Sequence, residues 1–213
     1  MLEALSDAFG APAPTDRLDP QGDGPVRVGV LVFHGVEILD FAGPLEVLSA
    51  LGCITIGEAS EVTCQGGLRI RPDRLVADDP PLDVLVVPGG PGTRRPEGET
   101  QPLIEYIRRR AGRARIVAGV CTGAFFLARA GLLDGRRATT HWRWKEALAQ
   151  RFPTVALTDG RTVDDGRIVT SAGVSAGIDL GLLLLARLQG TQAARQEAQR
   201  IEWPGPAPAA DDG

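Results

Sequence analysis

A cysteine at the junction of a buried strand and a helix is the most reactive feature of the sequence. Residues 115–120 form an apolar, β-branched run, residues 122–130 continue with a helical pattern, and Cys121 lies between them. Its flanks follow the spacing G-x-C-x-G, the nucleophile-elbow pattern with sulfur in place of oxygen. A thiol at the first turn of a helix meets the positive end of the helix dipole, which favours the thiolate. The sequence therefore predicts that Cys121 is a nucleophile with a lowered pKa.

The other two cysteines, Cys53 and Cys64, lie in strand-like runs without an elbow. A free cysteine is most often a small buried apolar residue, and for these two that interpretation is preferred. The same alternative exists for Cys121, but there the strand, the glycines and the helix all favour a nucleophile. Three cysteines give no paired framework, which fits a reducing compartment and predicts a cytoplasmic protein.

Thr122 follows the predicted nucleophile and opens the predicted helix. A hydroxyl in this position commonly caps a helix, but the backbone amide has a second use. The amide after a nucleophile on an elbow points to where negative charge develops, and an amide of Gly89 or Gly90 is a candidate second donor for an oxyanion hole. Tight glycine turns are frequent at strand ends, so this loop alone is weak evidence for an oxyanion hole. It becomes stronger evidence only if the loop lies beside Cys121.

Asp40 precedes a predicted helix at residues 44–51, whose first turn is expected to contain Pro44. Local sequence allows two interpretations of this carboxyl group. It caps the helix, or it faces Cys121 from the neighbouring strand end and holds a proton beside the sulfur.

The sequence has only two histidines, His34 and His141, so we expect no metal site built on imidazoles. His141 follows a predicted strand and is a candidate base or orienting group for Cys121. A structural histidine with a hydrogen-bonded ring is the alternative for the same residue. His34, near the end of the first strand, is the weaker candidate for such a group.

Length, composition and charge limit the class of protein. A chain of 213 residues with 43% hydrophobic residues is long enough for one sizeable core. The formal net charge of −4, with acidic and basic residues interspersed, provides no basic field for nucleic acid. Glu3 and Asp7 stand where a signal peptide would carry positive charge, and the apolar segment 181–188 is too short to span a membrane. We expect neither nucleic acid nor a membrane as a partner.

Strand and helix patterns alternate along residues 26–202, the predicted catalytic domain. The expected strands are residues 26–33, 83–87, 115–120 and 167–170, and the expected helices are residues 44–51, 102–110, 122–130, 142–151 and 175–189. Alternation of this kind predicts an α/β fold with a mainly parallel sheet and helices on both faces. Residues 53–75 are expected to form short antiparallel strands at a sheet edge, and residues 1–25 and 203–213 are expected to be disordered tails.

Several segments together resemble the ThiJ/PfpI superfamily. They are Phe-His-Gly-Val-Glu-Ile-Leu-Asp-Phe-Ala-Gly-Pro-Leu-Glu-Val within residues 28–51, and the segments 83–92, 120–124, 138–142 and 169–174. The resemblance covers residues 26–202 in order and is strongest to the isonitrile hydratases. Its relatives that act as proteases or deglycases usually have glutamate in the first loop and often histidine after the cysteine. This chain has Asp40 and Thr122 at those two positions, which favours the hydratase branch.

The resemblance implies a flavodoxin-like sandwich, usually a homodimer, which hydrates small isonitriles to N-substituted formamides without a cofactor. It assigns the catalytic cysteine to Cys121, the following threonine to Thr122 and the acid to Asp40. The expected intermediate is a covalent thioimidate on the cysteine.

Two other functions stay open. The same module forms the amino-terminal part of AraC-type regulators, where it senses a ligand. Against this reading, we expect too little chain after Arg200 for a helix-turn-helix pair. The second alternative is a hydrolase of the deglycase, glyoxalase or protease type.

Overall fold

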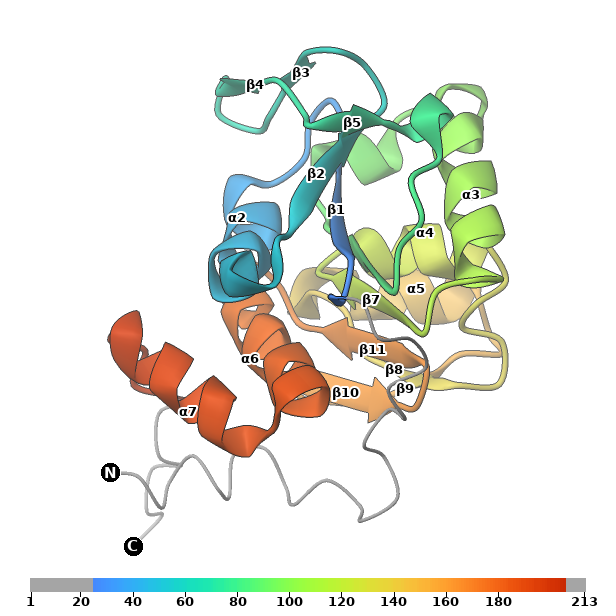
Figure 1. Ribbon diagram of the computed structural model, residues 1–213. Helices are drawn as coiled ribbons and strands as arrows, with labels where there is room; N and C mark the ends of the chain where they lie inside the picture. Colours follow the sequence, from blue (N-terminus) through green and yellow to red (C-terminus); the bar gives the residue numbers. More distant parts are fainter. Residues whose placement is uncertain (1–24, 206–213) are drawn as a thin grey trace, which may run out of the picture.

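A twisted, mainly parallel sheet forms the centre of the molecule in the computed structural model, which describes residues 25–205 (Figure 1). Six neighbouring strands are parallel, and only the edge strand β10 runs antiparallel to its neighbour β11. The strands in spatial order are β10 (Thr162–Asp165), β11 (Ile168–Ser171), β7 (Ile116–Val120), β6 (Val84–Val87), β1 (Val28–Val32), β2 (Ile54–Gly57) and β5 (Arg74–Leu75).

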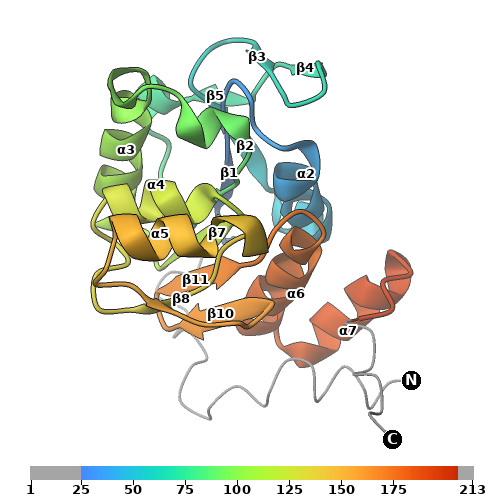
Figure 2. The same cartoon turned by 180° about the vertical axis from the view of Figure 1, so that it is seen from behind.

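Helices cover both faces of this sheet, as Figures 1 and 2 show. One face carries α2 (Ile38–Val47) and α6 (Ala176–Gln189), with α7 (Thr191–Arg200) packed on α6. The other face carries α3 (Glu97–Ala111), α4 (Gly123–Arg129) and α5 (Lys145–Arg151). Because both faces are covered, the central strands β1, β6 and β7 are buried along their whole length. The α/β sandwich predicted from the alternating pattern is confirmed.

The predicted strands fall in the central sheet, but one interpretation of the first half is wrong. Residues 53–75 contain the expected antiparallel pair, β3 (Val62–Thr63) and β4 (Arg69–Ile70), around a glycine turn. The same segment also supplies β2 and β5, which are parallel strands of the main sheet. The strand expected before His141 is the short β8 (Arg137–Ala138), which pairs with β9 (Ala156–Leu157), whereas β9 and β10 were not predicted.

Helix α2 begins at Ile38, six residues before the predicted start, and Pro44 lies inside it. The prediction that Pro44 opens the helix is wrong. Proline lacks the N–H that would bond to the carbonyl of Asp40, so local sequence favours a helix that begins at the proline. Close packing stabilises the longer helix, because Gly177 and Gly181 of α6 allow Pro44 to approach within van der Waals distance. Helix α3 likewise begins at Glu97 rather than at residue 102.

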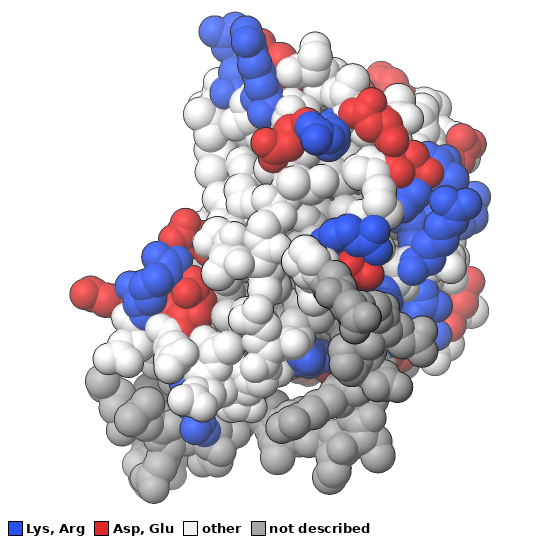
Figure 3. All heavy atoms as spheres, in the orientation of Figure 1, with Lys and Arg blue, Asp and Glu red and all other residues white. Residues whose placement is uncertain are grey.

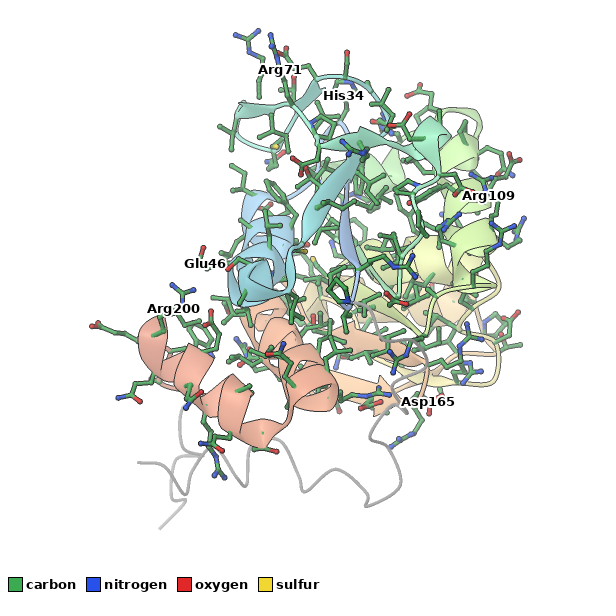
Figure 4. The ribbon with its side chains drawn as sticks, viewed as in Figure 1. His34, Glu46, Arg71, Arg109, Asp165 and Arg200 are labelled. Atoms are coloured by element: carbon green, nitrogen blue, oxygen red, sulfur yellow. The ribbon has the colours of Figure 1, made fainter. Side chains whose placement is uncertain are left out.

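Helix α7 was not predicted, because it has no apolar stripe and buries only the small side chains of Ala194 and Ala198. An exposed ion pair between Arg200 and Glu46 links it to α2 (Figure 4). Trp203 follows α7 and is anchored, since its indole N–H donates to Asp179. The predicted carboxy-terminal tail therefore does not begin at residue 203, and the rest of both predicted tails lies outside the described residues.

Acidic and basic side chains are interspersed over the face shown in Figure 3. Within residues 25–205, no helix is both long and apolar enough to cross a membrane.

Candidate active site

Cys121 stands on a sharp turn between β7 and α4, and its backbone is strained. Its φ of 56° lies in the left-handed region that non-glycine residues rarely adopt. Hydrogen bonds on both sides hold the residue there. Its N–H donates to the carbonyls of Ser171 (3.1 Å) and Ala172 (3.2 Å), and the Thr140 hydroxyl donates to its carbonyl (2.7 Å). The turn thus has the geometry of a nucleophile elbow.

The two glycines beside Cys121 are required by packing. A Cβ on Gly123 would collide with the Val87 carbonyl, and one on Gly119 would lie 2.8 Å from a Leu127 methyl group. Small residues at these positions let α4 begin directly above the ends of β6 and β7. The glycine spacing noted in the sequence therefore reflects close approach, whereas the positive φ belongs to the cysteine.

Asp40 lies fully buried in the first turn of α2 and faces the sulfur. The backbone amide of Gly89 donates to Oδ2 and that of Val174 donates to Oδ1, both at 3.0 Å. A hydrogen bond also links its carboxyl group to the Cys121 thiol. The side chain does not cap the helix, so the structure favours the second of the two interpretations of Asp40.

Val174 is a part of this site that sequence reasoning missed. Its φ of 55° is strained for a β-branched residue, and this conformation aims its N–H at Asp40 and Cys121. The loop that contains Val174 follows the carboxyl end of β11, where the reacting groups of a parallel sheet gather. Nothing in the local sequence could select Val174 itself, since backbone propensity opposes the conformation it adopts.

The amides of Gly89 and Gly90 have partners inside the protein. The Gly89 N–H donates to Asp40, and the Gly90 N–H donates to the Thr122 hydroxyl at 2.9 Å. The prediction that one of them completes an oxyanion hole conflicts with this geometry, because neither donor is free. Both amides instead fix side chains of the site. A Cβ on Gly89 would lie 2.6 Å from Thr122 Oγ1 and 2.8 Å from Asp40 Oδ2, so this glycine lets the two groups converge.

Burial dominates the electrostatics of the pair. Desolvation raises the pKa of Asp40 to about 7, although hydrogen bonds from Cys121, Gly89 and Val174 oppose the rise. Desolvation, followed by the charge of Asp40, raises the pKa of the Cys121 thiol to about 12, although amide hydrogen bonds from Thr122 and Val174 oppose this. The predicted lowering of the thiol pKa is therefore wrong, because desolvation outweighs the helix terminus. In consequence the pair retains at least one proton at neutral pH.

His141 packs on the loop that carries Val174, since a Cβ on Gly173 would collide with its ring. Its Nδ1 accepts a hydrogen bond from the Arg143 amide, and burial, followed by the charge of Arg143, lowers its pKa. This geometry fits a structural histidine beside the site, and a direct role toward Cys121 stays a prediction. His34 lies near β3 (Figure 4), where its Nδ1 accepts from the Thr63 amide.

Cys53 and Cys64 are free thiols outside the site, and burial raises the pKa of both. Among residues 25–205, no three or more His, Cys, Asp or Glu side chains are grouped so that they could hold a metal ion.

The chain belongs to the DJ-1/PfpI family, whose profile matches residues 26–187. A particular relative is the isonitrile hydratase of Pseudomonas putida, which is 38% identical over 194 residues. That alignment covers 88% of this chain and 82% of the relative. The HTH-type transcriptional regulator GbdR of Pseudomonas aeruginosa (strain UCBPP-PA14) is 30% identical over 81% of this chain, but over only 49% of its own length.

Solved structures show the same fold. A THiJ/PfpI family protein from Pseudomonas syringae has a TM-score of 0.79 and 30% identity, and the match covers 96% of this chain and 87% of that chain. Drosophila melanogaster DJ-1beta has a TM-score of 0.75 at 24% identity, which supports the fold alone.

Proposed function

We propose that this protein is a cysteine-dependent isonitrile hydratase, a lyase that converts a small isonitrile and water to an N-substituted formamide. The observation that carries the proposal is the buried, hydrogen-bonded pair of Cys121 and Asp40. An isonitrile carbon must receive a nucleophile and a proton at the same atom, and this pair offers sulfur and an acid side by side. The identity to the Pseudomonas putida hydratase over most of both chains supports the same reaction.

The first step uses the proton that the pair retains. Transfer of that proton from sulfur to Asp40 gives a thiolate next to a carboxylic acid, without any exchange with solvent. The thiolate of Cys121 attacks the terminal carbon while Asp40 delivers its proton to that carbon. The product is a covalent thioimidate, Cys–S–CH=N–R, together with the Asp40 carboxylate.

The second step replaces sulfur with oxygen. Asp40, now ionised, accepts a proton from water as the water oxygen bonds to the thioimidate carbon. The second water proton ends on nitrogen, and the carbon–sulfur bond breaks to release the formamide. Thiolate and carboxylic acid are thereby restored, so the cycle consumes one isonitrile and one water.

The experiment that tests this proposal is turnover of a simple alkyl isonitrile by the purified protein, with formamide followed by infrared or NMR spectroscopy. We expect formamide from the wild type and none from Cys121→Ala. Cys64→Ala is the matched control, because it removes another buried free thiol that lies outside the pair. A thioimidate adduct on Cys121, trapped and detected by mass spectrometry, would identify the intermediate.

Two other outcomes would contradict the proposal. A wild type that leaves isonitriles unchanged but consumes methylglyoxal would be an enzyme of the deglycase or glyoxalase type. A wild type that binds an isonitrile without turnover would be a sensor, the function for which the regulators matched over half their length provide the precedent.

A further inference from the structure

Thr93 and Thr122 both lie within hydrogen-bond distance of the Gly90 carbonyl, and Thr93 occupies it. The Gly90 carbonyl accepts the Thr93 N–H at 3.1 Å and the Thr93 hydroxyl at 2.8 Å. A carbonyl oxygen has two lone pairs, and Thr93 uses both. Thr93 is 5% exposed, so solvent does not compete for these bonds.

The hydroxyl oxygen of Thr122 is held in place, but its proton has no short hydrogen bond within the described part of the protein. Its Oγ1 accepts the Gly90 N–H at 2.9 Å, which holds the oxygen in place. The distance from Thr122 Oγ1 to the Gly90 carbonyl oxygen is 3.3 Å, longer than an ordinary O–H···O bond. The same Oγ1 also accepts the Thr93 hydroxyl at 3.0 Å, so both of its lone pairs are used inside the protein, while the described residues offer its own proton only the long bond.

The Thr122 hydroxyl lies close to the Asp40 carboxyl group. Its oxygen and Asp40 Oδ2 both lie within 3 Å of the point where a Cβ of Gly89 would stand. The hydroxyl is therefore a neighbour of the group that delivers the proton in the proposed reaction.

We propose that Thr93 is a positioning residue, which occupies the Gly90 carbonyl so that the Thr122 hydroxyl stays available as a hydrogen-bond donor to the substrate nitrogen. This inference rests on the proposed hydratase function, in which nitrogen acquires a proton during the second step. Thr93 itself touches no reacting atom and acts only through Thr122.

Thr93→Val removes the hydroxyl and leaves one lone pair of the Gly90 carbonyl open. The Thr122 proton then turns to that carbonyl, and we expect kcat to fall about tenfold while KM changes little, the effect of one lost hydrogen bond. Thr93→Ser keeps the hydroxyl and should stay within about twofold of the wild type. Thr100→Val is the matched control, since Thr100 is a buried threonine of α3 that pairs with Arg129 and not with the site.

A double-mutant cycle separates positioning from general support of the fold. If Thr93 acts through Thr122, then Thr93→Val has no further effect on kcat in a Thr122→Val background. Additive losses in the double variant would overturn the inference, as would a Thr93→Val enzyme with wild-type kcat.

A crystal structure of Thr93→Val gives a readout that needs no turnover. We expect the distance from Thr122 Oγ1 to the Gly90 oxygen to shorten from 3.3 Å to about 2.8 Å. An unchanged distance would overturn the inference even if the wild type hydrates isonitriles. Shortening in a protein whose wild type leaves isonitriles unchanged would support the positioning by Thr93 and refute the proposed function alone.

Discussion

Asp79 and Asp40 both contact buried groups, but their pKa values are shifted in opposite directions. Asp79 pairs with Arg110, whose guanidinium is almost fully buried at the end of α3, and with the more exposed Arg109. The hydrogen bond and charge of Arg110 lower the pKa of Asp79. Asp40 is more deeply buried, yet within the described chain no Lys or Arg pairs with it. Its partners are two backbone amides and a thiol, and desolvation raises its pKa to about 7.

The difference shows what a reactive carboxyl group requires. A guanidinium beside Asp40 would satisfy the charge and keep the group ionised, which suits a structural ion pair. Neutral donors satisfy the two oxygens without fixing the charge, so the proton remains exchangeable within the pair. Arg109, labelled in Figure 4, lies on the side where basic side chains gather in Figure 3.

The largest expected effect comes from removing the exchangeable proton. Asp40→Asn takes away both the acid of the first step and the base of the second, so we expect kcat for isonitrile hydration to fall about 10³-fold or more. Asp79→Asn removes a carboxylate that holds no reacting group and should leave kcat unchanged. Steady-state kinetics of the two variants checks the contrast, and an Asp40→Asn enzyme with full activity would remove Asp40 from the mechanism.

The pH dependence of stability sharpens the same contrast. The pKa of Asp40 is raised from 3.8 to about 7 in the fold, so between these values the native state binds a proton that the unfolded state does not. Stability must therefore fall as pH rises from about 4 to 7, by about 3–4 kcal/mol from this group. Urea unfolding at several pH values should show a smaller fall for Asp40→Asn than for the wild type.

Other titrating groups set the controls for that measurement. The pKa of His141 is lowered by burial and by Arg143, so its contribution rises with pH, but it is common to both proteins and cancels in the difference. Asp79 has a lowered pKa, so its contribution is lost only as pH falls below about 4. Asp79→Asn should therefore keep the wild-type slope between pH 5 and 8. Equal slopes for the wild type and Asp40→Asn would contradict a raised Asp40 pKa.

Some features of the site could be predicted from the sequence, and others depend on tertiary packing. The elbow around Cys121 was predictable, because strand, glycine spacing and helix are all local signals. The position of the site is also of a predictable kind, because reacting groups gather at the carboxyl ends of the strands of a parallel sheet. The pKa of the thiol was not predictable, since the burial that raises it depends on tertiary packing. Pro44 gave a misleading helix start for the same reason, because only the α6 glycines reveal the packing that overrides it.

Residues whose role depends on partners distant in sequence were missed. Val174 adopts a backbone conformation that its own side chain disfavours, and it does so next to an aspartate that lies 134 residues away. Thr93 follows the glycine loop in which the sequence pointed only to the amides of Gly89 and Gly90, and its bond to the Gly90 carbonyl depends on how that loop folds. Asp79 and Arg110 gave no pattern in the sequence, since the ion pair forms only after α3 packs beside η2 (Val76–Asp78).

The ion pair of Asp79 and Arg110 should contribute to the free energy of unfolding but not to kcat. Asp79→Ala leaves the guanidinium of Arg110 buried without its carboxylate, although the carbonyls of Pro80 and residue 79 still accept from it. We expect the free energy of unfolding to fall by about 2 kcal/mol, less than for a fully enclosed pair because the Asp79 carboxylate is partly exposed. Urea denaturation measures the loss, and kcat at a temperature well below the transition should match the wild type. A loss of kcat without a loss of stability would contradict the division between the two aspartates.

The smallest effect is expected at the neutral bond that supports the elbow. The buried hydroxyl of Thr140 donates to the Cys121 carbonyl at 2.7 Å, so Thr140→Val should lower the free energy of unfolding by about 1 kcal/mol. Because the same bond helps to hold the left-handed backbone of Cys121, kcat should also fall, by about threefold. Thr140→Ser keeps the donor and should restore both quantities. If Thr140→Val loses stability but keeps kcat, then the amide bonds of Cys121 to Ser171 and Ala172 are enough to hold the sulfur beside Asp40.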